Sequence, residues 1–161
     1  MKPSVNLMRP VKLKTKNKID KKLKIFSKTE NLSVVREFIQ SAAEQVGIKP
    51  GITEDVMLAV DEACTNVIKH AYKSHPDGEI LLKLKYSDHK LTIIITDYGK
   101  SFHPESVPDP DLQKYYRQHR VGGLGMYLMK TLMDEVRYNS IPGKYNEVYL
   151  TKYLNNTSQH G

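Results

Sequence analysis

The sequence predicts a single α/β domain, an α+β two-layer sandwich whose mainly antiparallel mixed sheet carries helices on one face. A chain of 161 residues fits one domain with one real core. Along it, apolar residues alternate with a period of two in some segments and recur at helical spacing in others. The strand patterns occur in neighbouring pairs joined by short turns, which favours antiparallel pairing.

Two amphipathic helices are predicted in the first half of the chain. Residues 32–46 repeat apolar side chains at helical spacing, with Ser33 as the expected N-cap and Gly47 at the C-terminal end. A second helix is expected to begin at an N-cap on Thr53 and to run to about Tyr72. A third helix is expected near the glycine-rich segment, over residues 124–133.

The strands are predicted from apolar alternation and β-branched runs. Ile80 and Leu82 alternate with Lys83, as in a half-buried strand, and the strand that follows should pair with this one as a hairpin. The expected strands cover residues 23–26, 80–86, 91–96, 136–139 and 147–153.

Charge divides the chain unevenly. The whole chain has 25 Lys and Arg residues and a net charge of +7. Ten of these basic residues lie within residues 1–30, which contain only two acidic residues. We therefore expect a flexible basic arm over 1–22, a folded domain over 23–153 and a tail over 154–161. Such an arm can bind nucleic acid or anionic surfaces. However, it lacks aromatic residues between the lysines, so nucleic acid is not a favoured partner.

Other sequence features indicate the cellular compartment of the protein. The sequence has no apolar run of membrane-spanning length, and we expect neither membrane association nor a signal peptide. The single cysteine, Cys64, excludes an internal disulfide, which suits a reducing cytoplasm. Without neighbouring ligands it is expected to be a small core residue.

The first functional candidate is Glu62-Ala-Cys-Thr-Asn66 on the second helix. At about 100° per residue, Glu62, Asn66 and Lys69 lie opposite the apolar face of this helix. A carboxylate there can accept a proton, and one amide oxygen suits Mg²⁺, which usually keeps several waters. Asp61 points to another side and is a weaker candidate. In isolation, a solvated polar face explains the same pattern.

The second candidate is Asp97-Tyr-Gly99, directly after a strand rich in isoleucine. An aspartate in that position places a carboxylate at the rim of the core, and Gly99 lets the backbone turn and come close to the ring of a bound ligand. On its own, the pattern is also that of a common turn.

The third candidate is the glycine-rich run Gly122-Gly123-Leu124-Gly125-Met126. Glycines before a helix leave backbone N–H groups free for phosphate oxygens. The run is not a Walker A sequence, because no Gly-Lys-Ser/Thr follows, and a flexible loop with a helix cap is the plain alternative. Residues 99–123 form a long loop with one expected helical turn at 113–119, and loops of that length are usually functional.

In this order and spacing, the three stretches resemble the nucleotide-binding boxes of the Bergerat-type ATP-binding fold of the GHKL superfamily. Gyrase, histidine kinases and heat-shock chaperones share that fold. Residues 62–72 and 120–136, together with Phe102 and Pro104, resemble more specifically the bacterial anti-sigma factor serine/threonine kinases. The resemblance covers about residues 24–153.

The resemblance implies a role for each candidate. Asn66 would bind Mg²⁺ and Glu62 would be the catalytic base, while Asp97 would accept the exocyclic amine of adenine. Residues 99–123 would form the ATP lid, and Arg120 or Lys100 would contact the γ-phosphate. The remaining nucleotide-binding residues expected are Lys69, Gly99, Phe102, Gly122, Gly123, Leu124, Gly125, Met126 and Asn146.

One position departs from the family pattern. Many relatives carry Gly-Thr before the last strand, where this chain has Tyr145-Asn146. Because an asparagine side chain still forms hydrogen bonds, we expect nucleotide binding to be retained.

The resemblance also implies a reaction and partners. Such a kinase phosphorylates a Ser or Thr of an anti-anti-sigma (STAS) protein and sequesters a sigma factor, and a homodimer is an open alternative. A sensor histidine kinase fragment is not expected, because only the short basic arm precedes Leu23. A non-catalytic, ATP-gated binding module in another signalling pathway stays open, because the same boxes serve both functions.

Overall fold

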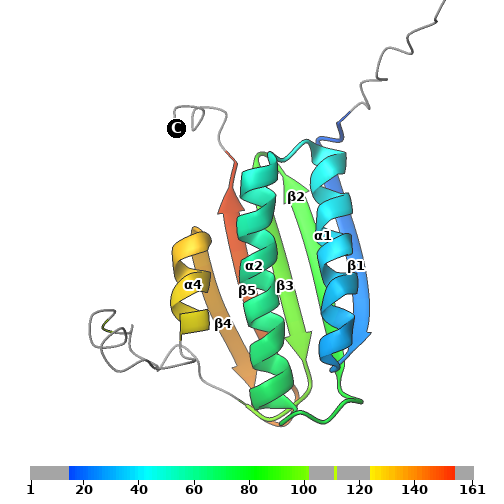
Figure 1. Cartoon of the computed structure of the whole chain (residues 1–161), viewed down its shortest axis with the longest axis vertical. Coiled ribbons are helices and arrows are strands. Elements are labelled where there is room, and N and C mark those ends of the chain that lie inside the picture. The colour runs from blue at the N-terminus through cyan, green and yellow to red at the C-terminus, as the bar shows by residue number, and fades with distance from the viewer. Residues whose placement is uncertain (1–14, 102–110, 112–123, 155–161) are drawn as a thin grey trace, which may run out of the picture.

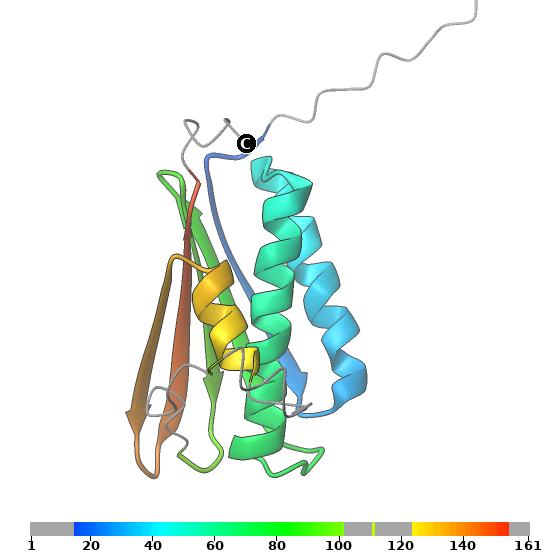
Figure 2. The same cartoon turned by 60° about the vertical axis from the view of Figure 1, so that its left-hand side comes forward.

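The computed structural model describes residues 15–101, 111 and 124–154. Its helices all cover one face of a five-stranded sheet, which confirms the predicted two-layer sandwich (Figures 1 and 2). No helix in these ranges is both long and apolar enough to cross a bilayer. The strands are β1 Lys18–Phe26, β2 Glu79–Ser87, β3 Lys90–Asp97, β4 Glu135–Ile141 and β5 Tyr145–Tyr153. The helices are η1 Thr29–Asn31, α1 Leu32–Val46, α2 Pro50–Asn66, η2 Val67–Ala71 and α4 Leu124–Leu132.

The sheet has the order β1-β2-β3-β5-β4, and all four pairings among the described strands are antiparallel. The expected hairpin of β2 and β3 is confirmed, with Ile80 opposite Asp97. Helix α1 lies over β1 and β2, α2 over the middle of the sheet and α4 over β4 (Figure 1). The end of β3 and the start of β5 therefore lie under the C-terminal half of α2.

Strand β1 is longer than predicted. Residues 18–22, expected in the basic arm, continue the strand and pair with β2 up to Lys18 opposite Ser87. Ile19 is buried on the helix-covered face, whereas Lys18 and Lys22 point to solvent. The density of lysines conceals this alternation, because Lys21 also occupies a position on the inner face.

Helix α2 begins earlier than predicted. Lys49 has extended dihedral angles and precedes Pro50 in the first turn, a position where the missing N–H of proline costs nothing. Thr53 is instead buried inside the helix, and its hydroxyl donates to the Lys49 carbonyl at 3.1 Å. The predicted N-cap on Thr53 is therefore wrong.

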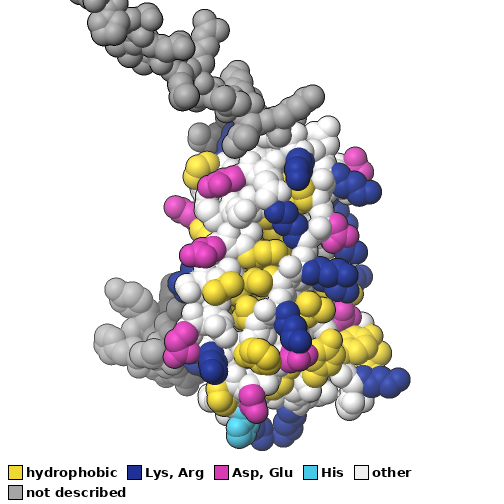
Figure 3. All heavy atoms as spheres, turned by 90° about the vertical axis from the view of Figure 1, so that its right-hand side faces the viewer, with side chains coloured by type: hydrophobic (Ala, Val, Ile, Leu, Met, Phe, Trp, Pro, Cys, Tyr) yellow, Lys and Arg dark blue, Asp and Glu magenta, His cyan; other side chains and the backbone are white. Residues whose placement is uncertain are grey.

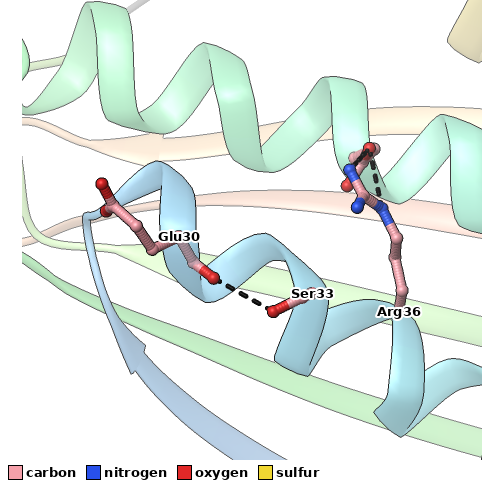
Figure 4. A network of polar contacts seen from close by, with 4 residues as sticks. Glu30, Ser33 and Arg36 are labelled. Atoms are coloured by element: carbon pink, nitrogen blue, oxygen red, sulfur yellow. Dashed lines mark hydrogen bonds and ion pairs between the residues drawn. The ribbon is translucent and has the colours of Figure 1, made fainter.

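Helix α1 is held to α2 by an ion pair. The Arg36 guanidinium donates to one carboxylate oxygen of Asp61 at 2.6 Å (Figure 4). Asp61 is thus used between the helices, in agreement with its weaker candidacy as a catalytic group. Ser33 is not the N-cap but lies one residue inside α1, where its hydroxyl donates to the Glu30 carbonyl. Gly47 ends the helix with φ 76°.

The core fills the space between the helices and the sheet. Its fully buried side chains include Ile39, Val60, Ile80, Leu82, Leu84, Ile93, Ile95 and Leu150. Cys64 is completely buried among them, and burial, together with the nearby Asp61 charge, raises the pKa of its thiol to about 12. The expectation that Cys64 is a core residue is confirmed, and its thiol stays protonated at neutral pH.

Substitution of two neighbouring isoleucines of β3 tests which face of the sheet packs against the core. Ile93 is fully buried, whereas Ile94 is half-buried on the open face. We expect Ile93→Ala to lower the free energy of unfolding by about 2–5 kcal/mol because it leaves a cavity. The matched Ile94→Ala should cost about 1 kcal/mol. Urea denaturation measures both values, and equal losses would contradict this assignment of the two faces.

Candidate nucleotide-binding site

A cavity of about 540 Å³, including its open mouth, lies where α2, η2 and α4 meet the ends of β3, β4 and β5. It brings together Asn66, Asp97 and Asn146, which are far apart in the sequence. Its apolar lining consists of Ala63, Val67, Ala71, Ile95, Met129 and Val148, and the lining also includes Tyr138, Asn139, Ser140 and Glu147.

Asp97 is the buried polar group of this cavity, with 4% of its surface exposed. Its Oδ1 accepts hydrogen bonds from the Gly99 N–H at 3.0 Å and from Asn146 Nδ2 at 2.8 Å. Burial raises the pKa of Asp97 above its usual value, and the two hydrogen bonds act in the opposite direction. Within the described residues, no donor reaches Oδ2, which leaves this oxygen as an acceptor for a ligand.

The end of β3 is fixed against η2 by a close backbone contact. The Lys100 N–H donates to the Ala71 carbonyl at 2.8 Å. A β-carbon at Gly99 would lie 2.5 Å from the same carbonyl oxygen. Only glycine therefore allows this approach, a contact with η2 that the sequence analysis did not foresee.

The C-terminal end of the second helix is a π-helical turn, η2, rather than regular α-helix. Asn66, the last residue of α2, lines the cavity as predicted. Lys69 lies within the π turn with an exposed side chain and is not among the described lining residues. The helical projection that grouped Lys69 with Asn66 assumed about 100° per residue, and a π turn rotates each residue by less.

Glu62 lies one turn before Asn66 and faces the beginning of α4. A β-carbon added at Gly125 would overlap Glu62 Oε2, so the carboxylate lies directly against the first turn of α4. The structure thus brings together the predicted base and one residue of the glycine-rich run. Met126 follows it and is half-buried against the core.

The remaining candidates lie at or beyond the limits of the described chain. Leu124 begins α4. The expected lid, with its helical turn, and four site candidates fall outside the described residues: Phe102, Arg120, Gly122 and Gly123.

Two polar residues of the site were missed by the sequence analysis. The Tyr72 hydroxyl accepts a hydrogen bond from the Tyr98 N–H at 2.8 Å and donates to the Glu79 carbonyl, joining the end of η2 to two strands. Ser140 donates to Asn146 Oδ1 inside the cavity. The only sequence signal for Ser140 is the Pro142-Gly143 turn, which sets the register of the last hairpin.

This fold, with the Asp97 carboxylate and the Asn66 amide in the lining of one partly apolar cavity, defines a histidine kinase-like ATPase domain. A family model of that description matches residues 25–152. The chain is 38% identical to the serine-protein kinase RsbW of Bacillus subtilis over 138 residues, 83% of this chain and 84% of that protein. It is 35% identical to RsbW of Listeria monocytogenes over 137 residues, 83% and 86% of the two chains.

A solved structure has the same fold. The crystal structure of the RsbU and RsbW domains of a Mycobacterium tuberculosis protein superposes with a TM-score of 0.61 at 15% identity, over 84% of this chain and 32% of that one. The chain belongs to the histidine kinase-like ATPase family and, within it, to the RsbW serine-protein kinases. Its nucleotide is therefore ATP.

Two glycine substitutions test the contact of Gly99 with η2. In Gly99→Ala the new methyl group meets the Ala71 carbonyl, which is backbone and cannot rotate away. We expect at least a tenfold loss of ATP affinity and about 1–3 kcal/mol less stability. Gly51 in the first turn of α2 has no atom within 4 Å of an added β-carbon, so Gly51→Ala is the matched control.

Fluorescent ATP-analogue binding and chemical denaturation measure the two effects. The control should bind nucleotide like the wild type and gain up to about 1 kcal/mol of stability. Equal behaviour of both variants would show that the close approach at Gly99 is unimportant.

Proposed function

We propose that this chain is an ATP- and Mg²⁺-dependent anti-sigma factor kinase of the cytoplasm. It phosphorylates a Ser or Thr of a small anti-anti-sigma protein of the STAS type, and it sequesters a sigma factor when that protein is phosphorylated. The observation that carries the proposal is the cavity, whose lining includes an acceptor carboxylate, Asp97, and Asn66 on the helix that also bears Glu62. The relatives named serine-protein kinase RsbW support the reaction class.

The base of the nucleotide occupies the partly apolar part of the cavity. Asp97 Oδ2 accepts the exocyclic amine of adenine, and the apolar lining removes the ring from water. Guanine presents a carbonyl oxygen at the equivalent position, which a carboxylate repels. Gly99 allows the ring to approach the backbone, and Asn146 holds the other oxygen of Asp97.

The phosphates lie toward α4 and the glycine-rich run. Backbone N–H groups of residues 122–126 bind phosphate oxygens, and the γ-phosphate contacts either Lys100, whose side chain is exposed, or Arg120. Within the described residues, no group of three His, Cys, Asp or Glu side chains could hold a metal ion. A single amide oxygen from Asn66, completed by phosphates and water, suits the oxygen preference of Mg²⁺.

Glu62 is the general base of the transfer. Its carboxylate takes the proton of the partner's hydroxyl as that oxygen forms a bond to the γ-phosphorus, and ADP leaves with the electrons of the broken P–O bond. Gly125 supports this role, because its lack of a side chain allows α4 to approach the carboxylate. A purely binding module has no need for a carboxylate in that position, which favours catalysis over the ATP-gated alternative.

Substitution of Glu62 tests the reaction. We expect Glu62→Gln to lower the rate of phosphotransfer about 10²–10⁴-fold while ATP binding is retained. Asp61→Asn is the matched control, because Asp61 is already paired with Arg36 on α1. Radiolabelled phosphate transfer to the partner measures the rate, and full activity of Glu62→Gln would refute the assigned base.

The partner for that assay comes from a pull-down. Glu62→Gln protein with Mg-ATP retains its partners because it does not release the substrate by phosphorylation. Mass spectrometry should recover a sigma factor and a small antagonist with a phosphorylatable Ser or Thr. Recovery of other regulators only would leave the ATP site in place and move the function to another signalling pathway.

A homodimer through the β1 edge belongs to the same proposal. β1 ends the sheet, so its outer N–H and C=O groups can pair with a second chain. Figure 3 shows hydrophobic side chains gathered on the side of the molecule formed by β1 and α1. On these two elements, Phe26 is 48% exposed and Val34 is 42% exposed.

Charge substitutions distinguish the two edges of the sheet. We expect Phe26→Asp to halve the molar mass in light scattering, because a carboxylate in that apolar patch opposes association. Ile141→Asp, at the opposite edge strand β4 and 38% exposed, is the control and should keep the wild-type mass. A monomeric wild type, or an unchanged mass in Phe26→Asp, would rule out this interface.

A further inference from the structure

The turn between the last two strands places two polar side chains opposite each other. Pro142 and Gly143 occupy its central positions, Gly143 has φ 78°, and the Lys144 N–H donates to the Ile141 carbonyl at 2.9 Å, as in a type II turn. The resulting register pairs Ser140 of β4 with Asn146 of β5, and both line the cavity.

The Asn146 amide has one orientation that suits its neighbours. Its nitrogen donates to Asp97 Oδ1 at 2.8 Å and to the carbonyls of Gly99 and Lys100 at 3.3 and 3.2 Å. All three partners are acceptors, so a flipped amide would turn its oxygen toward a carboxylate and two carbonyls. On the other side, the Ser140 hydroxyl donates to Asn146 Oδ1 and lies 3.4 Å from the Ser101 hydroxyl. A hydroxyl can donate or accept, so the three acceptors set the orientation of the amide and the Ser140 hydroxyl holds it in place.

We propose that Ser140 is a positioning residue for the base-binding carboxylate and acts on it through the Asn146 amide. The inference rests on the proposed role of Asp97 as the acceptor for adenine. It assigns a task to Ser140 that follows from the hairpin geometry: the hydroxyl fixes the amide, the amide occupies Asp97 Oδ1, and Oδ2 remains for the ligand.

Two consequences follow for the nucleotide. First, the two donors at Oδ1 hold the carboxylate in one position, so that Oδ2, which can only accept, meets the edge of the base and favours a donor there over an acceptor. Second, the same amide nitrogen ties the backbone at Gly99 and Lys100 to β5. Ser140 therefore contributes both to base selectivity and to the position of the chain that leaves β3.

The experiment is a titration of the full chain with ADP and with GDP by calorimetry. Ser140→Ala should weaken ADP binding about threefold to tenfold, and Asn146→Ala, which removes a bond to a charged group, about tenfold or more. Both variants should lower the preference for ADP over GDP. Ser140→Thr keeps the hydroxyl and should retain most of the affinity and the preference.

Ser33→Ala is the matched control. It also removes one serine hydroxyl, which donates to the Glu30 carbonyl at 3.1 Å, but on α1 and away from the cavity (Figure 4). We expect wild-type affinity and wild-type preference for ADP in this variant.

The pH profile of ADP binding separates positioning from a general loss of stability. Adenine binding needs ionised Asp97, so affinity falls as the pH decreases through the pKa of this group, which burial already raises. Without the Asn146 donor that pKa rises further, so Asn146→Ala should lose affinity at a higher pH than the wild type. The other titratable side chains that line the cavity, Tyr138 and Glu147, and Tyr72, which interacts electrostatically with Asp97, are unchanged in every variant.

The outcomes distinguish this inference from the proposed function. A wild-type chain that binds neither nucleotide would overturn the ATP-dependent function itself. If the wild type binds ADP but Ser140→Ala matches Ser33→Ala in affinity, in preference and in pH profile, the positioning role is wrong and the nucleotide site stands.

Discussion

A carboxylate can be buried at the end of β3 only because donors from two other parts of the chain meet it there. Removing a charged group from water is costly unless hydrogen bonds compensate. One donor to Asp97 is the N–H of Gly99, which is held close because its neighbour bonds to η2, and the other is the Asn146 amide from β5. The contact of β3 with η2 and the register of the last hairpin are therefore both conditions for this site.

The same constraint explains why the helical layer matters for chemistry. α2 carries the predicted base and the predicted metal ligand on one side and the core on the other, so its position relative to the sheet sets their distance from Asp97. The ion pair between Arg36 and Asp61 fixes α1 to the same helix, and the small Gly125 lets α4 approach from the other side. The site is thus a product of how three helices pack on one face.

The sequence predicted the parts of this molecule that depend on local periodicity. The sandwich, the β2–β3 hairpin and the apolar face of α2 follow from the spacing of apolar residues, which is visible within each short stretch of the sequence. The early start of β1 was missed because lysines occupy both faces of that strand, and the π turn that contains Lys69 was not predicted. Ser140 required the register of a hairpin, which is a tertiary property that no local pattern at that residue displays.

Because of the π turn, the number of residues between Asn66 and Ala71 determines the direction in which the backbone groups at its end point. Its wider turn accommodates more residues than an α-helix over the same rise, so η2 sets the direction in which the Ala71 carbonyl points toward the Lys100 N–H. Deleting one residue there would restore a regular helix but rotate that carbonyl away from β3. A single-residue deletion in this segment is therefore not comparable with one in a surface loop, since it would separate the helical layer from the sheet beside Asp97.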